Sequence, residues 1–320
     1  MFLSIIVNAQ DPNYSQFFSS PLTISPAFVG YSDCKWRGAA TFRNQSLGIG
    51  NSYNTKTLSF DGRIYNNEVS QNYLGLGGYC MLDDAMSGIY QSNYFSLNTA
   101  YHITLDKGEG FHALTVGLGW IYNKVNIDFS SLTTSQQLYS LGFNRTLPTG
   151  EPSLKDIPSY SSVSSGLMYS FTAEDMIFDI GVAGYRFIKT KQTVFDNGMQ
   201  FTTPRYDAHI NYGKVLNNHL NIFLNGYYQT QNGFSGFIGG GYISYILLAG
   251  DEAEKAVNLG GYYRLNDSFI PYMGFIFNDI QVGLSYDIKA SQTTGSITTN
   301  SFEVSLIYRN HKNSKNPLFW

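Results

Sequence analysis

Strict alternation of large apolar residues with small or polar residues recurs along this chain, and it limits the possible folds more than any other feature. The segment 280–289 (IQVGLSYDIK) has apolar side chains at its even positions and polar or small ones at its odd positions. Segments 95–106, 111–123 and 302–309 show the same period of two. Such alternation over eight or more residues is typical of β-strands whose two faces meet different environments.

The length of these runs separates two kinds of β protein. Strands of soluble sandwiches, which also alternate, average about five or six residues. Most runs here are longer, and about 10 residues suffice for a tilted strand to cross a bilayer. We count about 14 such runs, near residues 35–45, 54–64, 72–83, 92–105, 111–123, 160–171, 175–189, 205–215, 219–229, 234–248, 256–265, 268–277, 279–289 and 299–310.

Composition narrows the choice further. Charged residues make up 13% of the 320-residue chain, about half the usual share, and aromatic residues make up 16%. No stretch of 18 consecutive apolar residues is present, which argues against a membrane-spanning helix. A closed barrel is the β architecture that leaves no backbone group unpaired in lipid. The net charge of −3 gives no sign of nucleic-acid binding.

The connections between the runs provide an independent indication. If the N-terminus is placed in the periplasm, the short connections include those at 106–110, 172–174, 216–218 and 278 and fall on the periplasmic side. The long connections at 124–159, 190–204 and 290–297 then all fall on the outer side, which is the asymmetry of outer-membrane barrels. We therefore predict an all-β, transmembrane antiparallel barrel of about 14 strands. The longest connection, 124–159, is expected to be a lid, an inward plug or a contact surface.

The N-terminal residues suggest export. Met1–Ala9 (MFLSIIVNA) has an apolar core, and residues 7–9 resemble a small-residue cleavage site. It lacks a basic region, so we interpret it as the remnant of a longer signal peptide; a short apolar strand is the alternative. The expected organisation is a signal remnant (1–9), a periplasmic or plug segment (10–34), the barrel (35–310) and a C-terminal tail (311–320).

The segment Gln10–Gly30 (QDPNYSQFFSSPLTISPAFVG) fits neither a strand nor a helix. Its three prolines forbid regular structure. Its aromatic content is unusual for a disordered tail. We expect an irregular plug packed in the lumen or across its mouth, with a disordered periplasmic tail as the alternative. The residues concerned are Pro12, Pro21 and Pro26, with Tyr14, Phe17, Phe18 and Phe28.

Sequence motifs for catalysis or cofactor binding are absent. The chain has no G-x-S-x-G, HExxH or P-loop pattern, and its glycine runs lie inside predicted strands. His102 and His209 occupy lumen-type positions, and Asp83-Asp84 are interpreted as solvated turn charges. We expect no cofactor, no metal and no enzymatic activity, although a Ser–His hydrolase could be assembled from distant strands. Cys34 and Cys80 are interpreted as two independent thiols, with a disulfide as the alternative.

A set of short motifs is spread over nearly the whole chain. They are Gln10-Asp11-Pro12, Tyr14-Ser15-Gln16-Phe17, Ser25-Pro26-Ala27-Phe28-Val29-Gly30, residues 143–152 (FNRTLPTGEP), residues 259–264 (LGGYYR) with Asp267 and Ile270-Pro271-Tyr272, residues 283–288 (GLSYDI) with Ser291, and residues 301–306 (SFEVSL). Together these motifs resemble those of the PorP/SprF family, outer-membrane proteins of the type IX secretion and gliding systems of Bacteroidota. At the N-terminus, Ser25 replaces the family's usual Asn, and near the C-terminus Ser301 replaces its usual Gly.

The resemblance implies a function in secretion. It implies a barrel that supports the secretion and surface attachment of a large exported protein, an adhesin, held through that protein's type IX C-terminal domain. Further implied partners are outer-membrane lipid and periplasmic secretion or gliding components, with both chain termini periplasmic. The alternative is a plugged transporter for a small apolar solute. The motif positions that we expect to be structural are Pro26, Ala27, Gly30, Tyr262, Tyr263, Arg264, Asp267, Pro271, Tyr286, Asp287 and Glu303.

Two of these motif residues suggest contacts inside the barrel. Asp287 and Glu303 fall on the polar face of their strands, where an ion-pair network with Arg264 or Arg309 is expected. A structural role for this network is favoured over ligand binding.

Overall fold

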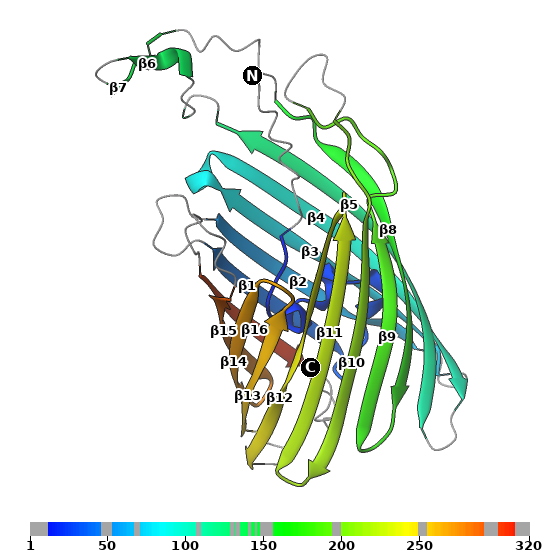
Figure 1. The fold of residues 1–320 in the computed structure, drawn as a ribbon. Helices are drawn as coiled ribbons and strands as arrows, with labels where there is room; N and C mark the ends of the chain where they lie inside the picture. Colours follow the sequence, from blue (N-terminus) through cyan, green and yellow to red (C-terminus); the bar gives the residue numbers. More distant parts are fainter. Residues whose placement is uncertain are drawn as a thin grey trace.

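The fold is a closed antiparallel barrel of fourteen strands, seen in a computed structural model (Figure 1). The structure describes residues 12–45, 53–66, 71–106, 110–128, 131, 135–139, 142–144, 146–147, 156–193, 200–248, 255–290 and 300–310. The barrel strands are β1 (Trp36–Gln45), β2 (Tyr53–Asn66), β3 (Tyr73–Ala85), β4 (Tyr90–Asp106), β5 (Phe111–Ile127), β8 (Tyr160–Thr172), β9 (Met176–Tyr185), β10 (Arg205–Asn217), β11 (Leu220–Gln231), β12 (Phe234–Leu248), β13 (Lys255–Arg264), β14 (Ser268–Phe277), β15 (Ile280–Lys289) and β16 (Ser301–Asn310).

Each barrel strand pairs with its neighbours in the chain, and β1 pairs with β16 to close the ring. The closing register runs from Trp36 opposite Asn310 to Gln45 opposite Ser301. The predicted fold is therefore confirmed. The sequence placed the end of β9 too late, since that strand ends at Tyr185. It also placed Asp83 and Asp84 in a connection, whereas both lie within β3 because pairing with β2 and β4 continues through them.

The two faces of the barrel differ in the way that the alternation predicted. In β2, Leu58 and Phe60 are exposed on the outer face, whereas Thr57, Ser59 and Asp61 are buried in the interior. The outer face resembles the apolar band of barrels that sit in lipid. Among the described residues, no helix is long and apolar enough to cross a membrane.

The two ends of the barrel also differ. Connections near Asp175, His219 and Asp279 are tight and lie at the end where β1 begins and β16 finishes. The long connections after β5, β9 and β15 lie at the opposite end, which we call the long-connection end. The connection after β5 contains a small antiparallel pair that the sequence did not indicate, β6 (Leu138–Tyr139) and β7 (Gly142–Phe143).

Candidate functional site: the plugged lumen

The segment 12–35 lies inside the barrel (Figure 1), and we call it the plug. It is built from three short 3₁₀ turns: η1 (Phe17–Ser19), η2 (Pro21–Thr23) and η3 (Pro26–Phe28). Pro21 and Pro26 begin two of these turns, where a missing N–H costs no internal hydrogen bond. The Ser25 hydroxyl accepts a hydrogen bond from the Ala27 N–H at 3.2 Å and caps η3.

The plug runs along the barrel from one end to the other. Pro12 and Asn13 line a cavity at the long-connection end. At the opposite end, the Lys35 N–H donates to the Asn310 carbonyl at 2.9 Å, next to the start of β1. The chain therefore passes through the lumen before it enters the first strand. The predicted positions of residues 1–11 and of the tail 311–320 fall outside the described residues.

Glycines in the barrel wall make room for the plug. A Cβ added to Gly117 would lie 2.4 Å from the Ala27 nitrogen, and one added to Gly75 would lie 2.4 Å from the Val29 oxygen. Gly30 has a φ of +72°, a conformation that other residues rarely adopt. The motif positions Pro26, Ala27 and Gly30 thus lie where the plug backbone touches the wall.

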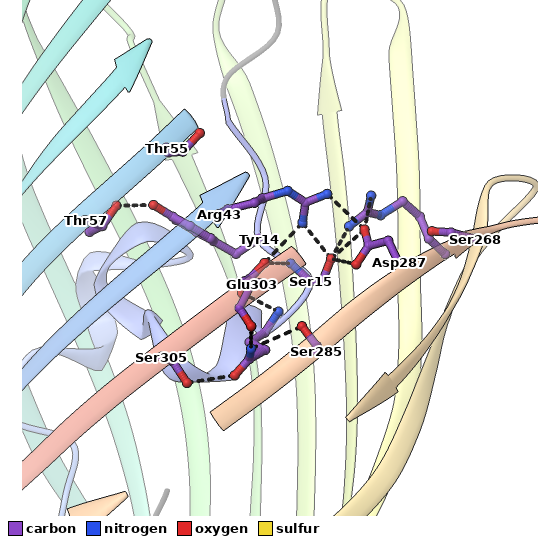
Figure 2. A network of polar contacts seen from close by, with 12 residues as sticks. Tyr14, Ser15, Arg43, Thr55, Thr57, Ser268, Ser285, Asp287, Glu303 and Ser305 are labelled. Atoms are coloured by element: carbon purple, nitrogen blue, oxygen red, sulfur yellow. Dashed lines mark hydrogen bonds and ion pairs between the residues drawn. The ribbon is translucent and has the colours of Figure 1, made fainter. Parts of the chain in front are cut away.

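An ion-pair cluster attaches the start of the plug to the wall (Figure 2), and we call it the latch: Ser15, Arg43, Asp287 and Glu303. The backbone N–H groups of Ser15 and Gln16 each donate to the Glu303 carboxylate at 2.8 Å. The Ser15 hydroxyl donates to Asp287 at 2.6 Å. Arg43 pairs with Asp287 at 2.9 Å and with Glu303 at 3.1 Å.

The strand register explains why these groups meet. Arg43 of β1 lies directly opposite Glu303 of β16, on the lumen face. All three charged side chains of the latch are at most 3% exposed. A buried carboxylate left without its cation is expensive, so each charge depends on the others. The latch therefore holds the start of the plug at one defined place.

Two motif residues extend the latch toward the long-connection end. Arg264 pairs with Asp287 at 3.2 Å and with Asp267 at 3.4 Å, and its guanidinium also donates to Ser15 at 2.8 Å. Lys289 forms an ion pair with Asp267. Arg309, the other expected partner, instead donates to Gln281 at 2.7 Å.

A second attachment holds the far end of the plug. The Asp61 carboxylate accepts from the Gly30 N–H at 2.8 Å and from Arg37 at 3.0 Å. Arg63 donates to the Gly30 carbonyl at 3.1 Å. A ring nitrogen of His102 lies 2.8 Å from the Val29 carbonyl oxygen, so this lumen histidine also binds the plug.

Aromatic packing fills the space between the two attachments. Phe17 stacks on Tyr227 with ring centroids 5.5 Å apart, and Phe18 stacks on Tyr262 at 5.3 Å. Phe18 also meets Tyr272 edge-on at 5.2 Å. Aromatic side chains buried in this way contribute both apolar burial and specific ring geometry.

The remaining motif positions, Tyr263, Tyr286 and Pro271, lie in different surroundings. Tyr263 and Tyr286 are 44% and 38% exposed on the outer face, away from the plug. Pro271 lies in β14, where pairing with β15 skips Ile270 and Pro271.

Cys34 and Cys80 are both free. Among the described residues, no three His, Cys, Asp or Glu side chains gather as a metal site.

Sequence reasoning missed the plug's main partners in β1 and β2. Arg37, Arg43 and Asp61 are charged residues at lumen-type positions of apolar strands, and that placement alone is a signal of buried pairing. Ser15 and Gln16 gave no such signal, because their partners lie more than 250 residues away.

Above the latch, a cavity of about 800 Å³ opens at the long-connection end, and we call it the mouth cavity. Arg264, Asp267 and Lys289 line one part of its wall, and Tyr53, Asp83 and Tyr90 line another. Pro12 and Asn13 also line it, so the plug borders this space.

Comparisons with solved structures agree on the architecture. A FadL homologue of Pseudomonas aeruginosa aligns with a TM-score of 0.54 at 8% identity, covering 95% of this chain and 96% of that one. The toluene transporter TodX of Pseudomonas putida aligns with a TM-score of 0.51 at 7% identity, covering 93% and 96%. At these identities the likeness concerns the fold alone. A search of curated proteins gives no sequence match.

The family comparison covers far more than a motif. The model of the type IX secretion system membrane protein PorP/SprF matches residues 6–308, which include the plug, the strands β1 to β15 and most of β16. The chain belongs to the PorP/SprF family of type IX secretion system membrane proteins.

Proposed function

We propose that this barrel works in the outer membrane as a docking protein of type IX secretion. It holds a large exported protein at the cell surface through that protein's C-terminal domain, and it contacts periplasmic secretion or gliding components on its other side. Family membership supports the link to secretion. We also propose that the exported protein is an adhesin.

The observation that carries the proposal is the plugged lumen. The latch and the Asp61 attachment fix the plug with buried charges, and aromatic rings pack between them. A barrel that conducts an apolar solute needs a continuous apolar path, whereas buried charge pairs on the strands from β13 through β16 and β1 to β2 hold the plug inside this lumen. The lumen chemistry therefore favours binding at the ends of the barrel over transport through it.

The two ends suit two different partners. We propose that the long-connection end faces the outside and binds the exported protein, with the connections 124–159 and 190–204 as contact surfaces. The tight turns at the other end then face the periplasmic components. In this orientation, Lys35 and Asn310 are periplasmic and Pro12 lies in the outer half of the lumen.

A pull-down from native outer membranes in mild detergent tests the proposal. The tagged protein should recover a large secreted protein with an intact C-terminal domain, or periplasmic secretion components, by mass spectrometry. Recovery of the barrel with lipid or small solutes and without any protein partner would contradict it. A strain that lacks the barrel should release the exported protein into the medium.

A further inference from the structure

Among the described residues that line the mouth cavity, one carboxylate, that of Asp83, has no cation beside it. Asp83 accepts a hydrogen bond from the Thr55 hydroxyl at 2.6 Å, and no Lys, Arg or His of the described residues lies within ion-pair distance of it. The other charges of the cavity wall are paired with each other: Arg264 and Lys289 both bind Asp267. Asp83 is thus the charge of the described cavity wall that a cationic ligand could pair with without displacing another cation.

Two tyrosines flank Asp83 on the same face of the sheet. Asp83 lies opposite Thr55 in β2 and opposite Ser92 in β4. Tyr53 and Tyr90 each lie two residues from these partners, and all three line the cavity. Side chains in such diagonal positions are within reach of one another.

A carboxylate with a tyrosine nearby on each neighbouring strand matches one side-chain chemistry best. A guanidinium can form a charge-assisted pair with the carboxylate and lie on an aromatic face at the same time. Lysine can make the same contacts less completely, because its ammonium is a compact, strongly hydrated charge. This part of the wall therefore fits an arginine side chain.

The rest of the cavity indicates that the arginine belongs to a polypeptide. Its volume of about 800 Å³ is near the upper end of the range for ligand pockets and is far larger than one side chain needs. The plug lies below it, so a ligand enters from the long-connection end. Pro12 and Asn13 show that irregular backbone already fits against this wall.

We propose that the mouth cavity binds an extended polypeptide segment and recognises an arginine of that segment through Asp83, Tyr53 and Tyr90. The inference rests on the proposed function in one respect: the protein that supplies the segment would be the exported protein. The site itself is defined by this chain's own residues.

The test is a binding assay with the purified full-length protein in detergent at low salt. The probe is a fluorescein-labelled hexapeptide of glycine and serine around one arginine; its twin carries citrulline, which has a similar shape and no charge. Fluorescence anisotropy should show that the arginine peptide binds at least about tenfold more tightly than the twin, because a charge-assisted hydrogen bond is lost.

Matched variants localise the effect. Asp83→Asn should reduce binding of the arginine peptide to the level of the twin. Asp84→Asn removes the same charge one residue away, from the other face of β3 where Asp84 pairs with Lys56, and should leave the affinity unchanged within about twofold. Tyr90→Leu should weaken the arginine peptide more than the twin.

Three results would overturn the inference: equal binding of both peptides, equal losses in the two aspartate variants, or competition by N-acetylargininamide as strong as that of the unlabelled peptide. The last would mean a site for a small cation. None of these results bears on the pull-down of an exported protein by the wild type, so failure here and failure of the proposed function are distinguishable.

Discussion

At the scale of single residues, Arg43 has the largest predicted effect. It is the cation shared by Asp287 and Glu303, and all three are buried. Arg43→Met leaves two buried carboxylates with less compensation, and we expect a loss of about 3–5 kcal/mol in the free energy of unfolding. Denaturant unfolding in detergent micelles measures it.

Lys56→Met is the matched control for that variant. Lys56 lies on the neighbouring strand, its side chain is 54% exposed, and it lies 3.9 Å from Asp84. Exposed pairs of this kind contribute little, so the change should be within about 0.5 kcal/mol. Equal effects of the two substitutions would show that the buried charges of the latch do not depend strongly on one another.

Asp267, in the turn between β13 and β14, gives a pH-dependent prediction. Its partial burial raises the pKa, but the hydrogen bond and charge of Lys289 and the charge of Arg264 outweigh this and hold the pKa below the ordinary value of 3.8. A lowered pKa stabilises the fold at pH values above 3.8, and this contribution disappears as the pH falls through the native value. The wild type should therefore exceed Asp267→Asn in stability at pH 7 and lose that advantage progressively below pH 3.8. Unfolding curves of both proteins across this range measure the difference; a constant difference would contradict the ion-pair explanation.

At the scale of elements, the plug depends on wall glycines. Gly117→Ala places a methyl group 2.4 Å from the Ala27 nitrogen, which the backbone of η3 cannot accommodate without moving. We expect the plug to loosen and thermolysin to cleave near Phe17 and Phe18 faster than in the wild type. Gly38→Ala is the control, because nothing lies within 4 Å of its added methyl group. Equal cleavage of both variants would mean that the plug does not rest on this contact.

The β14–β15 pair is a second feature at this scale. Pro271 has no N–H to donate, and the ladder between the two strands skips Ile270 and Pro271. Pro271→Ala should allow the ladder to close and slow hydrogen exchange at Tyr286 and Asp287. Unchanged exchange, measured by mass spectrometry, would show that another constraint keeps these positions apart.

At the scale of the whole molecule, the sequence predicted the barrel well and the plug's contacts poorly. Alternation is a local signal, so strands such as 234–248 and 268–277 were located at their observed bounds. The contacts of Ser15 with Asp287 and Glu303 join residues more than 270 positions apart and have no local period. The β6–β7 pair was missed because two-residue strands are too short for any periodic pattern.

The plug closes the lumen of this barrel, and we propose that the whole molecule acts by binding at its ends. The most direct measurement is the ion conductance of the purified protein in planar lipid bilayers, with Gly117→Ala and Gly38→Ala measured in parallel. We expect no steady conductance for the wild type or for Gly38→Ala, and stepwise opening for Gly117→Ala as the plug loosens. Steady conductance of the wild type at low voltage would contradict the account and favour a transporter.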